Sequence, residues 1–384
     1  MNFKSPFSGF RREFITDEVG VHAGNQAATA PAFSAPSEPP APSKKEAPYP
    51  WILHPAIDLF FCCGGLFWLL MIATFVIGIK VDVGTALILN IVGNVLFIGP
   101  HQPATLFRVY ESERTRKSVG VLVTAWGAFV IAFSAAALYS NLILGFFLLI
   151  TLSWGLQHVL AQVYGIVLIY CYKRQYIMNT HEKRSLFLLT QAALLFFVVR
   201  FFSYTHAYKG FQLPNIGRFP DWVLFGAGLA FQAAALYFVF MVVRKWVKER
   251  KLFPLPALLT LLTGILPTLI FTSPIVAIFI QSFFHSAQYN VVTASYFLKE
   301  KGLPEGVPYS KIATQLLSRR ALKYFGFLFL LGLLLSVCLP VAFVLAGFTT
   351  AGLVANCAIN MHHYFTDAAI WRMKDPVVRK LLVS

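Results

Sequence analysis

Charged residues are scarce in this sequence: 12% of its 384 residues are Asp, Glu, Lys or Arg, whereas 57% are hydrophobic. Together with a mean hydropathy of +0.66, this composition excludes an ordinary water-soluble domain and indicates a protein of the lipid bilayer. Acidic residues are rarer than basic ones, with 16 Asp and Glu against 32 Lys and Arg. In a membrane protein such a surplus is first a topology signal, so nucleic acid is not an expected partner.

Cysteine is also sparse, and its spacing excludes two further classes of protein. The five cysteines include no CxxC pair, and the adjacent Cys62 and Cys63 would form a disulfide only under strain. Neither a zinc finger nor a disulfide framework is therefore expected. We expect the cysteines to be buried apolar residues.

Residues 1–50 have few large aliphatic residues and are rich in Ala, Pro and Ser, which predicts a disordered cytoplasmic tail. The tail has no apolar core of a signal peptide, so we expect the first hydrophobic segment to direct membrane insertion. At its start, Phe3, Phe7, Phe10 and Phe14 recur at helical spacing among basic residues. This pattern is typical of a short amphipathic helix that docks on a membrane surface or on a protein partner, or else it is an irregular part of the tail.

The rest of the chain reads as an all-α transmembrane bundle. Each of ten apolar stretches is close to the roughly 20 residues that cross a bilayer core: about 59–79, 84–105, 119–139, 142–171, 185–204, 222–243, 255–272, 274–298, 322–347 and 348–371. Three of the breaks between them are short, at Ser140, at Ser273-Pro274 and at Gly347-Phe348.

Basic residues test this count of ten spans. One set of loops and helix ends carries 22 Lys and Arg residues, whereas the opposite set carries only Lys80, Lys209 and Arg218. The positive-inside rule then places both termini in the cytoplasm. We predict a bundle over 51–376, a short cytoplasmic tail over 377–384, and a multi-pass location in a bacterial inner membrane. No internal repeat of the kind found in many transporters is visible.

Polar residues within the predicted spans are costly in lipid and concentrate on the even-numbered ones. They recur at helical spacing: Asn90, Asn94 and His101; Trp154, His158 and Gln162; Gln281, His285 and Gln288; and Asn356, Asn360, His363 and Asp367, with His362 on a neighbouring face. At about 1.5 Å of rise per residue, one histidine of each span lies roughly 16 to 26 Å from its outer end. We therefore expect His101, His158, His285 and His363 to meet in the cytoplasmic half of the bundle.

Metal binding is the chemistry that requires such a cluster, because neutral imidazole binds iron, copper and zinc. A ligating histidine usually donates its second N–H to a carboxylate, carbonyl or amide. Candidates for that contact, or for an alternative ligand, are His362, Asp367, Gln162, Gln288, Asn94 and Asn360. For Asp367 an ion pair with Arg372 near the cytoplasmic interface is the competing interpretation.

The strings GPHQPATL and NMHHYFTDAAIW carry a resemblance to a known family. Gly99-Pro100-His101 looks like the PHG-like signature, and the segment from His363 to Asp367 is similar to the HFGxxD-like signature, of the bacterial membrane-bound β-carotene cleavage dioxygenases of the Brp/Blh type. The resemblance implies a polytopic fold, one non-haem iron held by intramembrane histidines, and a lipophilic isoprenoid substrate. The chain is also similar to uncharacterised polytopic bacterial membrane proteins with intramembrane histidine motifs.

Three functions follow from the polar pattern. The first is a non-haem iron oxygenase acting on an isoprenoid, pigment or lipid. Aromatic residues near the cluster either line its substrate cavity or serve as packing residues and interface anchors: Trp154, Tyr164, Tyr289, Tyr364 and Trp371. The second is a haem-binding electron carrier whose facing histidines clamp a porphyrin. The third is a transporter in which His363 and Asp367 handle a proton. The HxxxH and HxxHH boxes of membrane fatty-acid desaturases are absent from the sequence.

Overall fold

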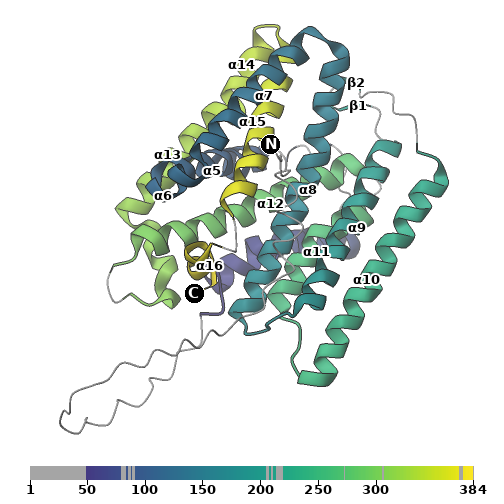
Figure 1. The fold of residues 1–384 in the computed structure, drawn as a ribbon, viewed down its shortest axis with the longest axis vertical. Helices are drawn as coiled ribbons and strands as arrows, with labels where there is room; N and C mark the ends of the chain where they lie inside the picture. The colour runs from purple at the N-terminus through teal and green to yellow at the C-terminus, as the bar shows by residue number, and fades with distance from the viewer. Residues whose placement is uncertain are drawn as a thin grey trace, which may run out of the picture.

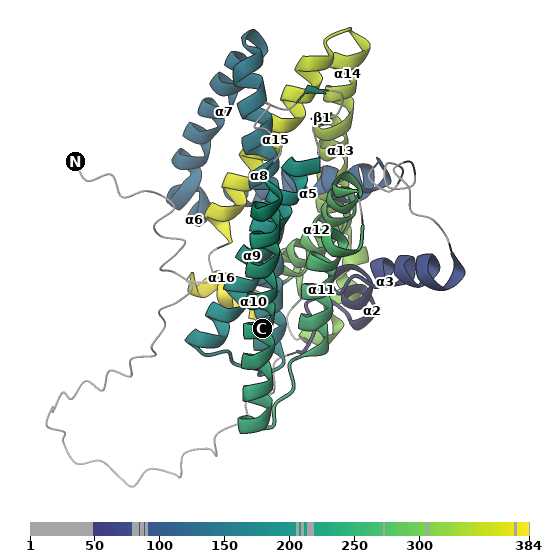
Figure 2. The ribbon, with the colours of Figure 1, turned by 90° about the vertical axis from the view of Figure 1, so that its right-hand side faces the viewer.

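A computed structural model describes residues 49–78, 84, 88, 91–204, 207–208, 211–212, 219–271, 273–304, 307–371 and 375–383. Nearly all of the predicted cytoplasmic tail, including its phenylalanine stripe, lies outside these residues. The described part is helical apart from loops and a two-residue ladder, so the all-α prediction is confirmed for it. Figure 1 and Figure 2 show the helices from two directions at right angles.

The N-terminal half of the described chain contains short, π-helical and long α-helical elements in succession. They are α2 (Pro55–Ile57), η1 (Asp58–Cys62), α3 (Gly65–Ile72), η2 (Ala73–Ile77), η3 (Asn94–Ile98), α5 (Gly99–Glu111), α6 (Glu113–Thr115), η4 (Arg116–Gly120), α7 (Val121–Tyr139), α8 (Asn141–Lys173) and α9 (Thr180–Tyr204). Strands β1 (Ala207–Tyr208) and β2 (Phe211–Gln212) follow and pair antiparallel.

The C-terminal half of the described chain also contains α-helices and shorter π-helical and 3₁₀ elements. Its elements are α10 (Asp221–Glu249), α11 (Leu255–Ile270), α12 (Pro274–Phe297), η5 (Leu298–Gly302), η6 (Tyr309–Leu317, a 3₁₀ helix), α13 (Arg319–Leu333), η7 (Leu334–Cys338), α14 (Leu339–Leu345), α15 (Thr349–Ile370) and α16 (Pro376–Val383).

Among the described residues, five continuous helical segments are long and apolar enough to cross a membrane: Glu113–Tyr139, Asn141–Lys173, Thr180–Tyr204, Asp221–Glu249 and Arg319–Leu345. A sixth is obtained if Pro55–Cys62 and Gly65–Ile77, which meet at a bend of 59°, form one span. The first predicted span is therefore broken. The bend is at Gly64, whose left-handed φ of +71° and close approach to the Thr263 side chain leave no room for a Cβ.

The three short breaks between apolar stretches are real helix ends. The Ser140 hydroxyl caps α8 and the Ser273 hydroxyl caps α12, where Pro274 occupies the first turn. Gly347 follows the end of α14 with a left-handed φ of +84°. The capping serines and this glycine allow consecutive helices to reverse direction within a few residues.

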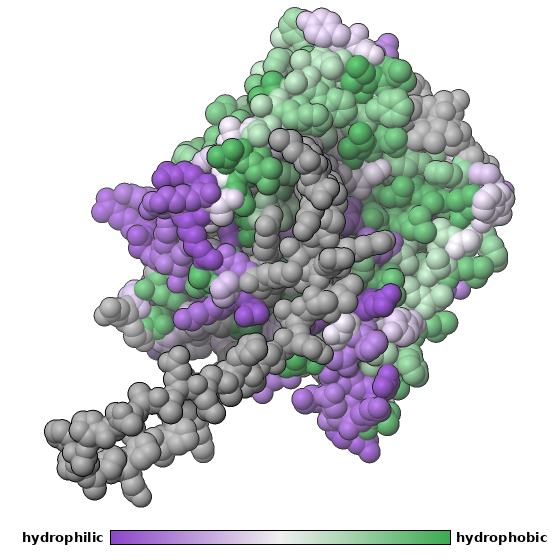
Figure 3. Space-filling model, viewed as in Figure 1, coloured by the Kyte–Doolittle hydropathy of each residue, from purple (hydrophilic) through white to green (hydrophobic). Residues whose placement is uncertain are grey.

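The outer surface of the bundle is apolar, as expected for helices that face lipid. Val121, Ile131 and Leu236 are 84%, 72% and 72% exposed, and they lie on α7 and α10. Figure 3 shows this hydrophobic surface over much of the face in view, with hydrophilic residues gathered toward one end. A water-soluble protein would hide so large an apolar surface, so the fold supports a membrane protein.

Helices α5, α8, α12 and α15 pack around the interior and carry the polar residues identified in the sequence. Helix α5 is held in place by α13, because Gly332 lies directly against the carbonyl group of Gly99. Helix α12 is tied to its neighbours by buried amides: Gln288 Nε2 donates to the Cys62 carbonyl, and Gln281 Nε2 donates to the Gly264 carbonyl. These contacts hold α5 and α12 against their neighbours.

Candidate metal centre

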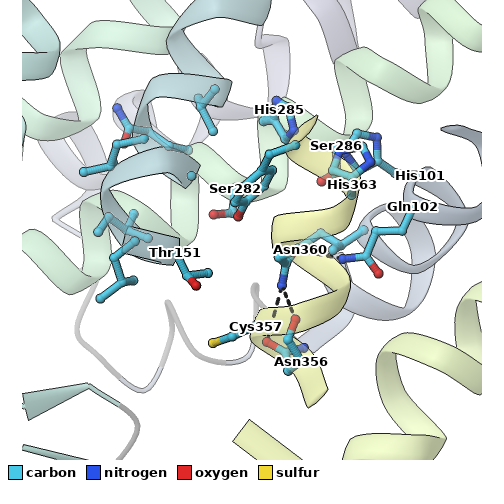
Figure 4. A pocket seen from close by; sticks show the side chains of 18 of the residues that line it. His101, Gln102, Thr151, Ser282, His285, Ser286, Asn356, Cys357, Asn360 and His363 are labelled. Carbon is cyan, nitrogen blue, oxygen red and sulfur yellow. Dashed lines mark hydrogen bonds between the residues drawn. The ribbon is translucent and has the colours of Figure 1, made fainter. Parts of the chain in front are cut away.

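Four histidines from four helices meet in the interior of the bundle, as the helical spacing predicts. His101 of α5, His158 of α8, His285 of α12 and His363 of α15 each offer one ring nitrogen, and these nitrogens all lie within 4.8 Å of one another. Their residues are 2%, 9%, 6% and 3% exposed. Figure 4 shows His101, His285 and His363 grouped at one end of a cavity. Four buried imidazoles this close are a group that can hold a metal ion.

The hydrogen bonds of His363 determine which of its ring nitrogens offers a lone pair to the cluster. Its Nδ1 lies 3.0 Å from Thr105 Oγ1, which in turn lies 2.8 Å from Asp367 Oδ1. A carboxylate offers only acceptors, so the single hydroxyl hydrogen of Thr105 goes to Asp367 and the His363 Nδ1–H donates to Thr105. On this assignment from the network, Nε2 of His363 carries the lone pair. That atom lies 3.2 Å from Nε2 of His158.

His101 and His285 are held differently. The Nδ1 atom of each ring is buried and has no hydrogen-bond partner in the described structure. Buried polar nitrogens without partners are uncommon and costly, because each loses its hydrogen bonds to water. A metal ion in the cluster provides a partner for imidazoles of this kind, so the donor set fits a metal.

Asp367 supplies negative charge beside the four rings. Its Oδ2 lies 3.6 Å from Nε2 of His158 and 3.6 Å from Nε2 of His363. Its Oδ1 accepts hydrogen bonds from Thr105 and, at 2.7 Å, from the Tyr289 hydroxyl. The carboxylate is therefore oriented by one oxygen and faces the cluster with the other. This arrangement suits a ligand to a metal or a partner of its ligands.

The polar network continues from Asp367 toward the ends of α5, α12 and α15. Trp371 Nε1 donates to the Tyr289 hydroxyl at 3.2 Å. The buried guanidinium of Arg108 lies between two rings, 3.7 Å from the centroid of Trp371 and 3.9 Å from that of Tyr296. These residues close one side of the histidine cluster, and the cation at their end is stabilised by the aromatic faces.

Two of the remaining sequence candidates, His362 and Gln162, do not enter the cluster. His362 points toward α7, where its Nε2 is 3.3 Å from the Val123 carbonyl, so His363 and not its neighbour joins the site. Gln162 donates to the backbone carbonyl of His285 and to the Gln288 side chain rather than to an imidazole. The Asn94 side chain lies outside the described part of the structure. Arg372, the predicted ion-pair partner of Asp367, also lies outside the described residues.

Asn360 belongs to a chain of amides that begins next to the cluster. It accepts a hydrogen bond from Gln102 at 2.8 Å and donates to the backbone carbonyl of Asn356 at 2.8 Å. Gln102 Oε1 in turn accepts from the Ser336 hydroxyl. These residues form a wall of a cavity, described below, whose other walls include Thr151 and Ser282 (Figure 4).

Sequence reasoning did not find Thr105 or Gln102. Thr105 lies one helical turn after His101, and the same spacing that selected the histidines would have selected it. Threonine is ordinary within membrane helices, and its hydroxyl commonly bonds to the preceding turn, so it gives a weak signal. Its role is visible only once α5 and α15 are placed side by side.

No family model, curated protein or solved structure matches this chain. The resemblance to the carotene-cleaving dioxygenases therefore stays a prediction. What the structure establishes is a helical protein of membrane type with a buried cluster of four histidines that can bind a metal.

Proposed function

We propose that this protein is a multi-pass membrane enzyme whose active centre is one non-haem metal ion, held by His101, His158, His285 and His363. The observation that carries the proposal is the convergence of four buried ring nitrogens within 4.8 Å. Bonds from a metal to imidazole are about 2.0 to 2.1 Å long, so ligand nitrogens around one ion lie about 3 to 4 Å apart. The cluster would need only small movements to reach that geometry.

Iron is the metal that the surroundings favour. The nearby carboxylate of Asp367 adds an oxygen donor to the imidazoles, and mixed histidine and carboxylate ligands are typical of non-haem iron oxygenases. Iron in such a site supplies redox chemistry with dioxygen. The chain's own contribution would be to orient His363 through Thr105, to neutralise the cation through Asp367, and to exclude bulk water by burial.

The geometry favours this function over the two alternatives. Ring centroids of His101 and His363 are 4.1 Å apart, and those of His158 and His285 are 4.8 Å apart. Rings packed this closely leave no room for a flat porphyrin between them, which argues against a haem carrier. A transporter would distribute its polar groups along a path, whereas these four imidazoles gather at one point.

The proposal includes the topology: ten spans in the cell membrane with both termini on the cytoplasmic side. On this arrangement α8, α12 and α15 run from the outer to the inner surface. The 22-to-3 distribution of basic residues supports it. The variants Lys80→Cys and Lys117→Cys, treated with a thiol reagent that cannot cross the membrane, would test this topology. Only the cysteine at position 80 should react from outside the cell.

Metal analysis of purified protein tests the active centre. We expect about one metal ion per chain in the wild type and its loss in His363→Ala. The matched control is His362→Ala, because this neighbour lies on the same helix and faces α7. Equal metal content in His363→Ala and His362→Ala, with both variants folded, would overturn the proposal.

A further inference from the structure

A cavity of about 130 Å³ lies against the histidine cluster. Its walls include His101, His285 and His363, and it extends along α8 from Val159 back to Thr151. Eight residues of helix correspond to about 12 Å. The lining residues of α8, α12 and α15 run mainly from the histidines toward the beginnings of these helices, whereas Asp367, Tyr289 and Trp371 follow the histidines in sequence and do not line it. The cluster is thus open on one side and closed by the carboxylate network on the other.

Among the described residues, no Lys, Arg, Asp or Glu lines this cavity. A charged ligand buried there would lose its hydration without gaining an ionic partner other than the metal centre. The walls alternate between amides or hydroxyls and aliphatic side chains such as Leu152, Leu156 and Ile278. A neutral molecule with one polar end suits such walls.

The amide oxygens of Gln102 and Asn360 already accept hydrogen bonds from within the amide wall. The backbone carbonyl of Asn356 can only accept, so Asn360 Nδ2 must face it and Asn360 Oδ1 must face Gln102 Nε2. Gln102 Oε1 is then occupied by the Ser336 hydroxyl. Each amide in this row is oriented by the next one.

Gln281 differs from these amides. It is 3% exposed, lines the cavity, and lies one turn before His285 on α12. Its Nε2 donates to the Gly264 carbonyl at 2.8 Å, which fixes the orientation of the amide because a carbonyl cannot donate. Its Oε1 is therefore an acceptor, and this buried atom has no partner in the described structure. A buried acceptor without a partner is costly, so an O–H or N–H donor on a molecule in the cavity would stabilise it.

We propose that the cavity binds a neutral, hydroxyl-bearing organic molecule, an alcohol or a phenol, whose O–H donates to Gln281 Oε1. Its apolar part lies against Leu152, Leu156 and Ile278. As the substrate class of the metal centre, this inference rests on the proposed function. It narrows the expected lipophilic substrate to one that brings a hydroxyl group next to the histidines.

Phenol and toluene are matched probes, because they have nearly the same shape and differ in one hydroxyl group. Their saturable binding to the full-length protein in lipid nanodiscs can be measured by equilibrium dialysis, with empty nanodiscs subtracted for partitioning into lipid. We expect wild-type protein to bind phenol at least about 10-fold more tightly than toluene, because toluene leaves Gln281 Oε1 unpaired. In Gln281→Met the preference for phenol should disappear.

The control variant is Gln288→Met, which removes a buried glutamine of the same helix that bonds to the Cys62 carbonyl and does not line the cavity. It should keep the preference for phenol. Equal binding of both probes to the wild type, a preference that survives in Gln281→Met, or no saturable binding because water alone fills the cavity would each overturn the inference.

Metal content measured on the same samples separates this inference from the proposed function. A preference for phenol in protein that binds no metal would leave the cavity as a binding site and refute the metal enzyme. One metal per chain without any preference for phenol would refute the substrate class alone.

Discussion

The Nε2 atoms of His158 and His363 lie 3.2 Å apart, although the two residues are separated by 205 positions in the sequence. Adjacent ligands of one tetrahedral or octahedral metal ion with bonds of about 2.1 Å are about 3.0 to 3.4 Å apart, so this distance fits a shared ion. Asp367 Oδ2 lies 3.6 Å from both atoms. The two imidazoles and the carboxylate thus form one corner of the proposed site.

Thr105 should be required for full metal affinity, because its hydroxyl connects His363 Nδ1 to Asp367. Replacement of such a supporting partner typically weakens metal binding by about 10- to 100-fold. We predict a loss of this size in Thr105→Val, measured by competition with a chelator of known affinity. Thr260→Val removes another fully buried hydroxyl, which bonds to the Cys62 carbonyl, and should leave the affinity unchanged. Equal affinities in the two variants would refute the role of Thr105.

Gly332→Ala should weaken metal binding although Gly332 is not part of the histidine cluster. A Cβ at this position would overlap the carbonyl group of Gly99, two residues before His101. The clash is with backbone, so α5 or α13 must move, at a cost of about 1 to 3 kcal/mol. We expect a lower melting temperature and weaker metal binding.

Gly326→Ala provides the control for that substitution, because it lies on the same helix and a Cβ there would contact nothing within 4 Å. It should leave metal binding unchanged and raise stability slightly, since alanine favours a helix over glycine. A Gly332→Ala variant that behaves like Gly326→Ala would show that the close approach of α13 to α5 does not position His101.

The titration of Lys299 should make the stability of the folded protein depend on pH. It lies in η5, donates to the Leu381 carbonyl at 2.9 Å, and has its pKa lowered to about 6, first by burial and then by the nearby Lys173 ammonium. The pKa in the unfolded chain is about 10.4. Between these values the unfolded state binds a proton that the folded state does not, so the free energy of unfolding rises with pH from about 6 to about 10.

Replacing this lysine by methionine removes the titrating group. Lys299→Met should therefore be more stable relative to the wild type at pH 6 than at pH 9, as judged by melting temperatures in detergent. The exposed Lys311→Met is the control and should shift the melting temperature equally at both pH values. A difference between Lys299→Met and the wild type that does not change with pH would contradict the assignment.

Helical periodicity was sufficient to predict that one histidine from each of four helices meets the others, because residues three or four apart share a helix face. It also predicted that Asp367 lies beside His363. It did not distinguish His362 from His363, since adjacent residues point about 100° apart and either one can face the interior. Only the packing of α15 against α7 and α8 places His362 beside Val123 and His363 in the cluster.

Features that depend on the direction of hydrogen bonds were not predictable from the sequence. Gln281, Gln162 and Gln288 are all glutamines within predicted spans. The structure pairs the Nε2 atoms with the carbonyls of His285, Cys62 and Gly264, respectively, for Gln162, Gln288 and Gln281. The Oε1 atoms of Gln162 and Gln281 have no partner in the described structure, and of these two residues Gln281 lines the cavity. The bend at Gly64 was likewise hidden, because a broken apolar stretch has the same hydropathy as a straight one.

X-ray absorption spectroscopy of the protein loaded with one equivalent of Zn²⁺ tests the central claim most directly, because it counts imidazole ligands and measures their distances. We predict three to four histidine nitrogens at about 2.0 to 2.1 Å, falling by one in His101→Ala and unchanged in His362→Ala. A bound ion with one histidine or none, or a spectrum that His101→Ala leaves unaltered, would contradict the account.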